Sequence, residues 1–238
     1  MKPYDPTGDK KSQIRAMFDN IAPTYDRLNH MMSMNIDRLW RRRTVETVAR
    51  RAPQRVLDVA TGTGDMALAL ARRLPGAVIT GADISEQMLG VARRKIAAAG
   101  LEERISLVAA DAERLPFDDD AFDAVTVAFG VRNFGDIGVG LRELHRVLRP
   151  GGMLAVLELS TPGSRPVRAL YNLYAHRILP WMGSRVSRDR KAYEYLPASV
   201  DEFPSAERFS EMVRAAGFSC CKARSQSLGT AYIYESVK

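Results

Sequence analysis

Short apolar runs alternate along the chain with segments in which apolar residues recur every three or four positions. The runs are too short for helices and predict strands at 55–60, 77–82, 105–110, 122–129 and 153–159. The helically spaced segments predict helices at 66–74, 85–100, 137–148 and 203–216. Parallel strands need crossover connections, which are usually helices, so the alternation predicts an α/β fold with a Rossmann-like, doubly wound sheet. Two extended segments, 218–224 and 230–237, predict antiparallel strands at the end of this sheet.

Two parts of the chain lie outside this alternation. Residues 11–51 have a helical pattern and predict an N-terminal helical lid. Residues 161–200 form an insertion after the fifth strand, at the sheet edge where inserted segments usually contact substrate. We therefore expect a lid at 1–51 and a main domain at 52–238, with an acceptor-binding insertion at 161–200.

The composition excludes several classes of protein. The chain has 238 residues, of which 46% are hydrophobic and 26% charged, as expected for a globular protein with one large core. Its longest uncharged stretches fall well short of the roughly 18 apolar residues that a membrane span requires. The N-terminus has neither the apolar core nor the small-residue cleavage site of a secretory signal, so we expect a cytoplasmic protein.

The cysteines and histidines indicate neither a disulfide framework nor a metal site. Cys220 and Cys221 are adjacent, so a bond between them could not close a long loop. The three histidines, His30, His145 and His176, are far apart and have no cysteines at ligand spacing. We expect reduced thiols and no bound metal.

A net charge of +7 makes anionic partners attractive, whether nucleic acid, a membrane surface or an acidic metabolite. The basic residues do not cluster with the stacking aromatic residues of a known RNA-binding module, and the length leaves no room for a separate RNA-binding domain. We therefore expect no nucleic-acid partner.

A glycine-bearing loop follows the first predicted strand, where doubly wound folds bind nucleotides. Its glycines, Gly62 and Gly64, fit a dinucleotide as well as S-adenosylmethionine, and a tight turn without a ligand is a third interpretation. The flanking carboxylates, Asp58 and Asp65, would repel a pyrophosphate but attract the ammonium and sulfonium groups of S-adenosylmethionine. The charges therefore favour S-adenosylmethionine.

Acidic residues also follow the next two strands. Asp83 ends the second strand about twenty residues after the loop, where a carboxylate can accept hydrogen bonds from both ribose hydroxyls. Asp111 and Ala112 follow the third strand, from which they could contact the adenine amino group and ring. The alternative for Asp111 is the cap of a helix or turn.

A cation and an amide, Arg132 and Asn133, follow the fourth strand, beside the expected position of the methyl group. We interpret them as groups that stabilise a developing oxyanion or position a water molecule, and helix capping is the alternative. The N-terminal segment 18–42 mixes aromatic and polar residues, as expected of a lid over a partly apolar ligand.

Three motifs carry a family resemblance: FDNIAPTYDRLNHMMSMNIDRLWRR at 18–42, RVLRPGGML at 146–154 with ELS at 158–160, and YEYLPASV at 193–200. They resemble the ubiquinone/menaquinone biosynthesis C-methyltransferase family, and the resemblance covers nearly the whole chain from about residue 14. Two positions depart from it: many members have histidine at Asp37 and methionine at Leu28. These departures leave the ring system of the acceptor open.

The resemblance implies a class I S-adenosylmethionine-dependent methyltransferase fold and methyl transfer to a ring carbon of a polyprenylated quinol. We favour demethylmenaquinol, in menaquinone biosynthesis, as the acceptor. One alternative is the benzoquinol precursor of ubiquinone, and another is a non-catalytic S-adenosylmethionine-binding subunit of a biosynthetic complex. Together, the residue patterns and the resemblance predict donor contacts at Asp58, Thr61, Gly62, Thr63, Gly64, Asp83, Ile84, Asp111, Ala112 and Ala128.

The expected chemistry needs alignment and help with deprotonation, but no metal. A ring carbon beside a quinol hydroxyl becomes nucleophilic when that hydroxyl loses its proton. We expect Arg132, assisted by Tyr25 and Asn133, to promote this loss and hold the phenolate. Since arginine stays charged, electrostatic stabilisation is preferred to direct proton abstraction.

The insertion 161–200 mixes apolar residues with arginines. The apolar ones are Leu170, Tyr171, Leu173, Tyr174, Ile178, Leu179, Pro180 and Trp181, and the arginines are Arg165, Arg168, Arg177 and Arg185. Such a face could rest on anionic lipid at the inner side of a membrane while a groove admits the isoprenoid tail. An ordinary packed helical cap with a solvated basic rim is the alternative. A homodimer is also left open.

Overall fold

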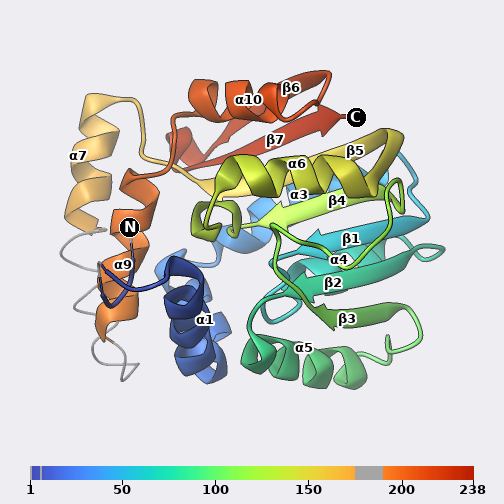
Figure 1. Ribbon diagram of the computed structural model, residues 1–238. Coiled ribbons are helices and arrows are strands. Elements are labelled where there is room, and N and C mark those ends of the chain that lie inside the picture. The colour runs from blue at the N-terminus through green and yellow to red at the C-terminus, as the bar shows by residue number, and fades with distance from the viewer. Residues whose placement is uncertain (1, 6, 175–189) are drawn as a thin grey trace.

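Seven strands form one sheet in the order β3-β2-β1-β4-β5-β7-β6 in the computed structural model, which describes residues 2–5, 7–174 and 190–238 (Figure 1). The strands are β1 (Arg55–Val59), β2 (Val78–Asp83), β3 (Ile105–Ala109), β4 (Phe122–Ala128), β5 (Leu148–Leu159), β6 (Cys220–Gln226) and β7 (Ala231–Val237). Strands β1 to β5 are parallel to one another, whereas β7 runs antiparallel between β5 and β6. The predicted doubly wound sheet and its antiparallel C-terminal strands are confirmed.

Helices cover both faces of this sheet (Figure 1). The α-helices are α1 (Lys10–Ile21), α2 (Tyr25–Met32), α3 (Ile36–Ala49), α4 (Asp65–Arg73), α5 (Glu86–Ala98), α6 (Ile137–Val147), α7 (Arg165–Leu173), α9 (Arg190–Asp201) and α10 (Ala206–Ala215). Short 3-10 turns are η1 (Ala22–Thr24), η2 (Val131–Asn133) and η4 (Ser227–Gly229). Four of the α-helices, α4, α5, α6 and α10, were predicted from their apolar spacing.

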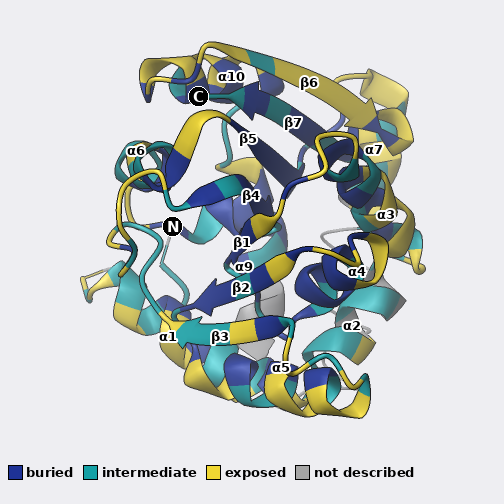
Figure 2. Ribbon diagram, turned by 90° about the vertical axis from the view of Figure 1, so that its right-hand side faces the viewer, coloured by how far each residue is buried: buried dark blue, intermediate teal, exposed yellow. Residues whose placement is uncertain are grey.

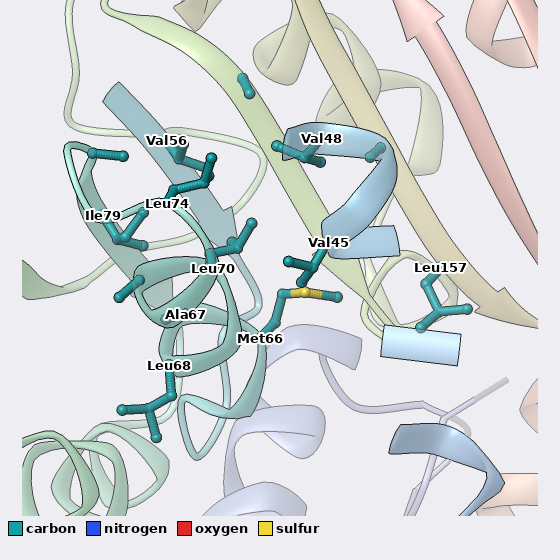
Figure 3. Close-up of a cluster of buried hydrophobic side chains, with 14 of the residues drawn as sticks. Val45, Val48, Val56, Met66, Ala67, Leu68, Leu70, Leu74, Ile79 and Leu157 are labelled. Atoms are coloured by element: carbon teal, nitrogen blue, oxygen red, sulfur yellow. The ribbon is translucent and has the colours of Figure 1, made fainter. Parts of the chain in front are cut away.

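Two apolar cores lie on opposite faces of the sheet because successive strand residues point to opposite sides. Val56 and Ile79 pack with α3, α4 and α5 on one face (Figure 3). Leu57 and Val125 pack with α6 and α10 on the other. Figure 2 shows the resulting buried layer along the central strands, with exposed residues on the outer sides of the helices. Each fully buried aliphatic side chain contributes about 1.5–3 kcal/mol by leaving water.

The N-terminal helices differ in how they pack. Trp40, Val45 and Val48 of α3 belong to the core that also contains α4. Figure 3 shows Val45 and Val48 beside the side chains of α4. Helix α1 instead forms a small separate cluster in which Ile14 and Met17 pack against Tyr195. The division into a lid at 1–51 and a domain at 52–238 stays a prediction, but α3 is part of the main core. We use "lid" below for α1, η1 and α2 alone.

The insertion after β5 includes α7 and α9 at its two ends. Six of the apolar and arginine residues that the sequence singles out in this insertion lie outside the described residues. They are Arg177, Ile178, Leu179, Pro180, Trp181 and Arg185. None of the helices in the described ranges is both long and apolar enough to cross a bilayer. The sequence motif at 193–200 lies in α9, which contains Pro197.

The order of the strands reverses between β1 and β4, which are adjacent in the sheet although far apart in the sequence. The loops that follow such strands separate to opposite sides and leave a ligand crevice at the carboxyl edge. The two loops nevertheless touch near their origin, since a Cβ atom at Gly130 would lie 2.5 Å from Ala60 Cβ. Glycine is therefore required where the loop after β4 passes the loop after β1.

Candidate active site

A first cavity, with about 690 Å³ of empty volume including the part open to solvent, lies at the carboxyl ends of β1 to β4. The sheet side is lined by Val59, Ala60, Gly62, Asp83, Ile84, Met88, Ala110, Asp111, Ala112, Glu113, Ala128, Phe129, Gly130, Asn133, Phe134 and Gly135. The lid closes the opposite side with Lys11, Ile14, Phe18 and Tyr25. The lid therefore forms one side of this cavity and the strand ends form the other.

The loop after β1 needs left-handed backbone at three positions, with φ of 53° at Ala60, 55° at Gly62 and 82° at Gly64. Glycine adopts this conformation readily. Asp58 holds the loop from behind, because its buried carboxylate accepts hydrogen bonds from the Thr61 hydroxyl at 2.6 Å and the Thr126 hydroxyl at 2.7 Å. Burial raises the pKa of Asp58 to about 6, although these hydrogen bonds oppose the shift.

Asp83 points its carboxylate toward the same loop from the end of β2. It accepts the Gly62 N–H at 2.8 Å and the Ser85 N–H at 2.9 Å, and it also lines the first cavity. Burial raises the pKa of Asp83 to about 6, whereas the backbone hydrogen bonds lower it. A carboxylate has about four acceptor positions, so Asp83 can still accept hydrogen bonds from a ligand.

The far end of the first cavity carries three charged residues. Asp111 follows β3, and its carboxylate pairs with Lys11 Nζ of α1 at 2.7 Å. The same Lys11 Nζ lies 2.7 Å from Glu113 Oε2. The lid is thus held to the strand ends at the place where we expect adenine to bind.

A second cavity, with about 1,360 Å³ of empty volume including the part open to solvent, adjoins the first. It is lined by Tyr25, Asn29, Ser33, Met34, Ile36, Asp37, Trp40, Arg41, Phe129, Arg132, Leu159, Val167, Leu170, Tyr171, Tyr174, Leu196, Pro197, Val200, Ser227, Leu228 and Thr230. Most of this lining is apolar or aromatic. A large apolar cavity with few polar groups is typical of a site for an apolar ligand.

Tyr25 and Phe129 line both cavities and form the wall between them. Phe129 has a φ of 59°, which is unusual for a bulky residue. Its ring contacts the Arg41 guanidinium, 5.2 Å from the ring centroid, and its carbonyl accepts a hydrogen bond from Arg132 Nη1 at 2.7 Å. Such strain persists only where the surroundings enforce it, and it concentrates at functional sites.

Arg132 lies in the second cavity and forms a buried ion pair. Its Nη1 is 2.5 Å from Oε1 of Glu158, a residue of β5 that is 0% exposed. Burial alone would lower the pKa of Arg132, but the charge and hydrogen bond of Glu158 raise it above its usual value. Arg132 therefore stays cationic, which favours the electrostatic role expected from the sequence over proton abstraction.

Tyr25 and Asn133 complete the polar groups around the wall. Burial raises the pKa of Tyr25, and the nearby charges of Arg132 and Arg41 partly oppose this shift. Asn133 lines the first cavity, and its side-chain oxygen accepts a hydrogen bond from the Tyr195 hydroxyl at 3.1 Å. The three residues predicted to be catalytic thus lie around the junction of the two cavities.

Residues 6–238 match the ubiE/COQ5 methyltransferase family. The chain belongs to this family. It is 43% identical over 238 residues to the demethylmenaquinone methyltransferase of Bacteroides fragilis, covering all of this chain and 97% of that protein. It is 52% identical over 203 residues to the demethylmenaquinone methyltransferase of Thermus thermophilus, covering 85% and 91% of the two chains. It is 47% identical over 231 residues to the ubiquinone/menaquinone biosynthesis C-methyltransferase UbiE of Geobacter sulfurreducens, covering 97% and 90%.

Solved structures confirm the fold. The [4+2]-cyclase SpnF superposes with a TM-score of 0.71 at 23% identity and covers 96% of both chains. A SAM-dependent methyltransferase from Thermotoga maritima has a TM-score of 0.64 at 19% identity, covering 94% of this chain and 99% of that one. The predicted class I methyltransferase fold and the family resemblance are therefore confirmed. This ubiE/COQ5 family member is an S-adenosylmethionine-dependent methyltransferase.

The structure divides the predicted donor contacts into two groups. Those that line the first cavity are Gly62, Asp83, Ile84, Asp111, Ala112 and Ala128. Asp58, Thr61, Thr63 and Gly64 do not line it, and they shape or support the loop. Thr63, for example, donates a hydrogen bond from its hydroxyl to Asp26 of the lid. Direct donor contact stays a prediction for all ten residues.

Several residues at the site were missed by sequence reasoning. Glu158 lies within a motif that we quoted, but nothing in the sequence pairs it with Arg132. Tyr195 lies in another motif, and its contact with Asn133 joins segments 62 residues apart. Ile14 and Phe18 had a detectable signal, since two apolar residues four positions apart share one face of a helix.

The lid of this family member is fastened to the main domain by charged contacts. Asp19 accepts a hydrogen bond at 2.5 Å from the Ser85 hydroxyl, which caps α5. Lys95 of α5 lies 2.6 Å from Asp26 of α2 and 2.5 Å from Asp65 of α4. One ammonium group therefore holds together two carboxylates that would otherwise repel each other.

Arg41 places a second buried guanidinium in the wall of the second cavity. It pairs with Asp37 one turn earlier in α3. Asp37 also accepts a hydrogen bond from Ser33 at 2.5 Å and lies 3.0 Å from His30 Nδ1. Asp37, which departs from the family's usual histidine, thus links α3 to the end of the lid.

Proposed function

We propose that this methyltransferase moves a methyl group from S-adenosylmethionine to a ring carbon of a polyprenylated quinol, and that the quinol is demethylmenaquinol. One observation carries the proposal. A cavity whose lining includes the carboxylates of Asp83 and Asp111 and an apolar cavity with a buried arginine share a single wall, formed by Tyr25 and Phe129. A cationic alkyl donor suits the first, and an aromatic anion with a long apolar tail suits the second.

The donor fits the residues of the first cavity. Asp83 would accept hydrogen bonds from the ribose hydroxyls, while Asp111 and Ala112 would contact adenine. Ile14 and Phe18 of the lid would cover the nucleoside and exclude water. The sulfonium methyl group would then point toward Tyr25 and Phe129, across which the acceptor ring lies.

The reaction divides between the donor's chemistry and the protein's contribution. S-adenosylmethionine supplies an activated methyl group: a C–C bond forms to the ring, the S–CH₃ bond breaks, and the sulfur keeps the electron pair. The quinol hydroxyl gives its proton to water before the transfer, and the ring carbon afterwards gives its hydrogen to water as a proton, which restores aromaticity. Arg132 stabilises the phenolate, held in place by Glu158, while Tyr25 and Asn133 orient the ring and water.

The choice of demethylmenaquinol has its support in the relatives. The Bacteroides fragilis and Thermus thermophilus proteins are named demethylmenaquinone methyltransferases, whereas the Geobacter sulfurreducens name covers ubiquinone and menaquinone. The volume and apolar lining of the second cavity suit an isoprenoid tail on either ring. We also propose that the enzyme works on the cytoplasmic side of a membrane, since such a tail resides in lipid. The homodimer and the absence of a nucleic-acid partner stay predictions.

A labelled-methyl assay tests the proposal. The purified protein receives S-adenosyl methionine with a labelled methyl group and either a short-tailed demethylmenaquinol or the matching demethylated benzoquinol. We expect label in the menaquinol ring and slower labelling of the benzoquinol. Preference for the benzoquinol would favour the ubiquinone alternative. Donor binding without labelling of either ring would favour the non-catalytic subunit and overturn the proposal.

A further inference from the structure

Three large apolar side chains are exposed where the second cavity opens to solvent. Met34 is 67% exposed, Leu170 is 69% exposed and Leu228 is 77% exposed. All three line the second cavity, yet they come from the turn before α3, from α7 and from η4. We call them the portal residues. Scattered exposed apolar residues are ordinary, but three that converge on one apolar cavity mark a candidate interaction site.

Two of the portal residues are held in strained backbone. Met34 has a φ of 51° and Leu228 a φ of 61°, a left-handed region that such residues rarely adopt. Each of these two conformations is unfavourable for a residue with a side chain and persists only because the surroundings enforce it. The turn before α3 is fixed by the Asn35 N–H, which donates to His30 O at 2.8 Å, and η4 by Trp40 Nε1, which donates to Ser227 Oγ at 3.0 Å.

Exposed arginines lie close in sequence to the portal residues. Arg38 and Arg42 are exposed on α3, in the two turns that follow Met34, and Arg165 is exposed at the start of α7. No ion pair involves them within the described ranges. Figure 2 shows α2, α3 and α7 along the same side of the molecule. Apolar tips flanked by exposed cations match the surface of a bilayer that contains anionic lipid.

We propose that the portal residues insert into an anionic bilayer and that the tail of the acceptor passes between them, directly from lipid into the second cavity. This inference rests on the proposed function. It differs from the membrane contact predicted from the sequence, which used the insertion 161–200 alone. Here the contact combines three separate segments around one opening.

Continuity with the second cavity favours a bilayer over a second copy of the chain. An isologous contact would bring the same surface of each copy together. It would close both openings and place the flanking arginines of the two copies against each other. A bilayer instead supplies both the apolar ligand and the negative charge.

The test compares the wild type with the triple variant Met34→Gln/Leu170→Gln/Leu228→Gln. Flotation uses vesicles of phosphatidylcholine and phosphatidylglycerol at 3:1, and we expect at least a tenfold loss of vesicle binding. Turnover is measured with a long-tailed acceptor in the vesicles and with a short-tailed acceptor in solution. Since the portal residues also line the cavity, the ratio of the two losses is the decisive quantity. We expect the loss in vesicles to exceed the loss in solution by at least tenfold.

Val78→Gln is the matched control, because Val78 is an exposed apolar residue on β2 and lines neither cavity. It should leave flotation and turnover unchanged. The proposal is overturned if the wild type does not float, if the triple variant floats equally well, or if both acceptors lose turnover equally. A wild type that is dimeric and a triple variant that is monomeric would assign the surface to a second copy of the chain, and this result would also overturn the proposal. If the wild type methylates the short-tailed acceptor in solution, the proposed function holds, and any of these outcomes then counts against the membrane proposal alone.

Discussion

Arg132 and Glu158 form a buried pair beside the acceptor, so removal of the arginine should affect turnover and stability together. We predict that Arg132→Ala lowers kcat by about 10²–10³-fold, the usual effect of removing one oxyanion-stabilising donor. The dissociation constant for S-adenosylhomocysteine should change little, because Arg132 does not line the first cavity. The variant should also lose about 3–5 kcal/mol of stability, since Glu158 is left as an unpaired buried charge.

The double variant Arg132→Ala/Glu158→Gln separates these two effects. Removing the stranded charge should restore much of the stability, as measured by thermal unfolding, but none of the turnover. Steady-state kinetics and calorimetric titration with S-adenosylhomocysteine provide the other measurements. Equal losses in turnover and donor affinity would contradict the role of Arg132, and so would recovery of turnover in the double variant.

Asp83 makes donor binding dependent on pH. Its pKa is raised to about 6 by burial, so the carboxylate gains a proton as the pH falls through 6 and loses part of its capacity to accept ribose hydroxyls. We predict that donor affinity decreases between pH 7 and pH 5. Asp83→Asn should bind S-adenosylhomocysteine about 10–100-fold more weakly at pH 8, as expected for lost charge-assisted hydrogen bonds, and with a flatter pH profile. Calorimetric titrations from pH 5 to 8 measure both.

Stability should respond to pH in the opposite direction. Burial raises the pKa values of Asp58 and Asp83 above the ordinary value of 3.8 for an aspartate, so the folded state binds these protons more tightly than the unfolded state. The two groups therefore favour folding as the pH falls from above 6 toward 4. Thermal unfolding without donor distinguishes loss of affinity from loss of fold. This role for Asp83 would be ruled out if the wild type bound S-adenosylhomocysteine equally well at every pH. It would also be ruled out if the affinity of Asp83→Asn changed with pH as steeply as that of the wild type.

Lys95 is the contact through which α5 holds the lid, at the scale of whole elements. In Lys95→Met, Asp26 and Asp65 would face each other without the cation between them. We predict faster hydrogen exchange in α1 and α2, while the exchange of the central strands is unchanged. Donor affinity should fall several-fold, because the lid forms one side of the first cavity. Hydrogen exchange with and without S-adenosylhomocysteine is the measurement.

Arg94→Met provides the comparison, since Arg94 is exposed on the same helix and the structure gives it no ion pair in the described ranges. It should match the wild type in lid exchange and donor affinity. Unchanged lid exchange in Lys95→Met would show that the remaining contacts, such as Asp19 with Ser85, suffice to close the lid. The cation would then have no role in closure.

The sheet could be predicted from the sequence because its buried strands are short apolar runs between helical segments. The start of β5 could not. The sequence predicts this strand from residue 153, because Pro150, Gly151 and Gly152 are typical of a turn, but pairing begins at Leu148, opposite Phe122. The register of β4 against β5 shifts between Phe122 and Ala124, so that residues 149–152 fit between the two paired positions of β5. Helix α9 was missed for a similar reason, because Pro197 within it hides the helical pattern.

At the scale of the whole molecule, residues at strand ends could be assigned to the site because parallel strands bring their carboxyl ends together. Asp83 and Asp111 were predicted in this way, and both line the first cavity. Contacts that join distant segments could not be predicted, such as Arg132 with Glu158 or Lys11 with Asp111. The second cavity is an extreme case, because its walls come from the lid, α3, the insertion and η4.

The way in which α3 packs predicts how the molecule responds to truncation from the N-terminus. A variant that begins at Met34 lacks α1 and α2 but keeps Trp40, Val45 and Val48 in the main core. We predict that it unfolds cooperatively and fails to bind S-adenosylhomocysteine, because the lid side of the first cavity is gone. A variant that begins at Ala52 should not fold, since losing each large buried side chain costs about 2–5 kcal/mol against a total stability of about 5–15 kcal/mol.

Circular dichroism during heating and calorimetric titration distinguish the two variants. If α3 is the first element of the main core, the chain that begins at Met34 unfolds in a cooperative transition and the chain that begins at Ala52 shows none. Cooperative folding of both would mean that α3 is part of a separable lid, as the division at residue 51 predicts. Loss of folding in both would mean that the small cluster of Ile14, Met17 and Tyr195 is essential, so that lid and domain form one cooperative unit. Donor binding by the chain that begins at Met34 would show that the strand ends alone hold S-adenosylhomocysteine.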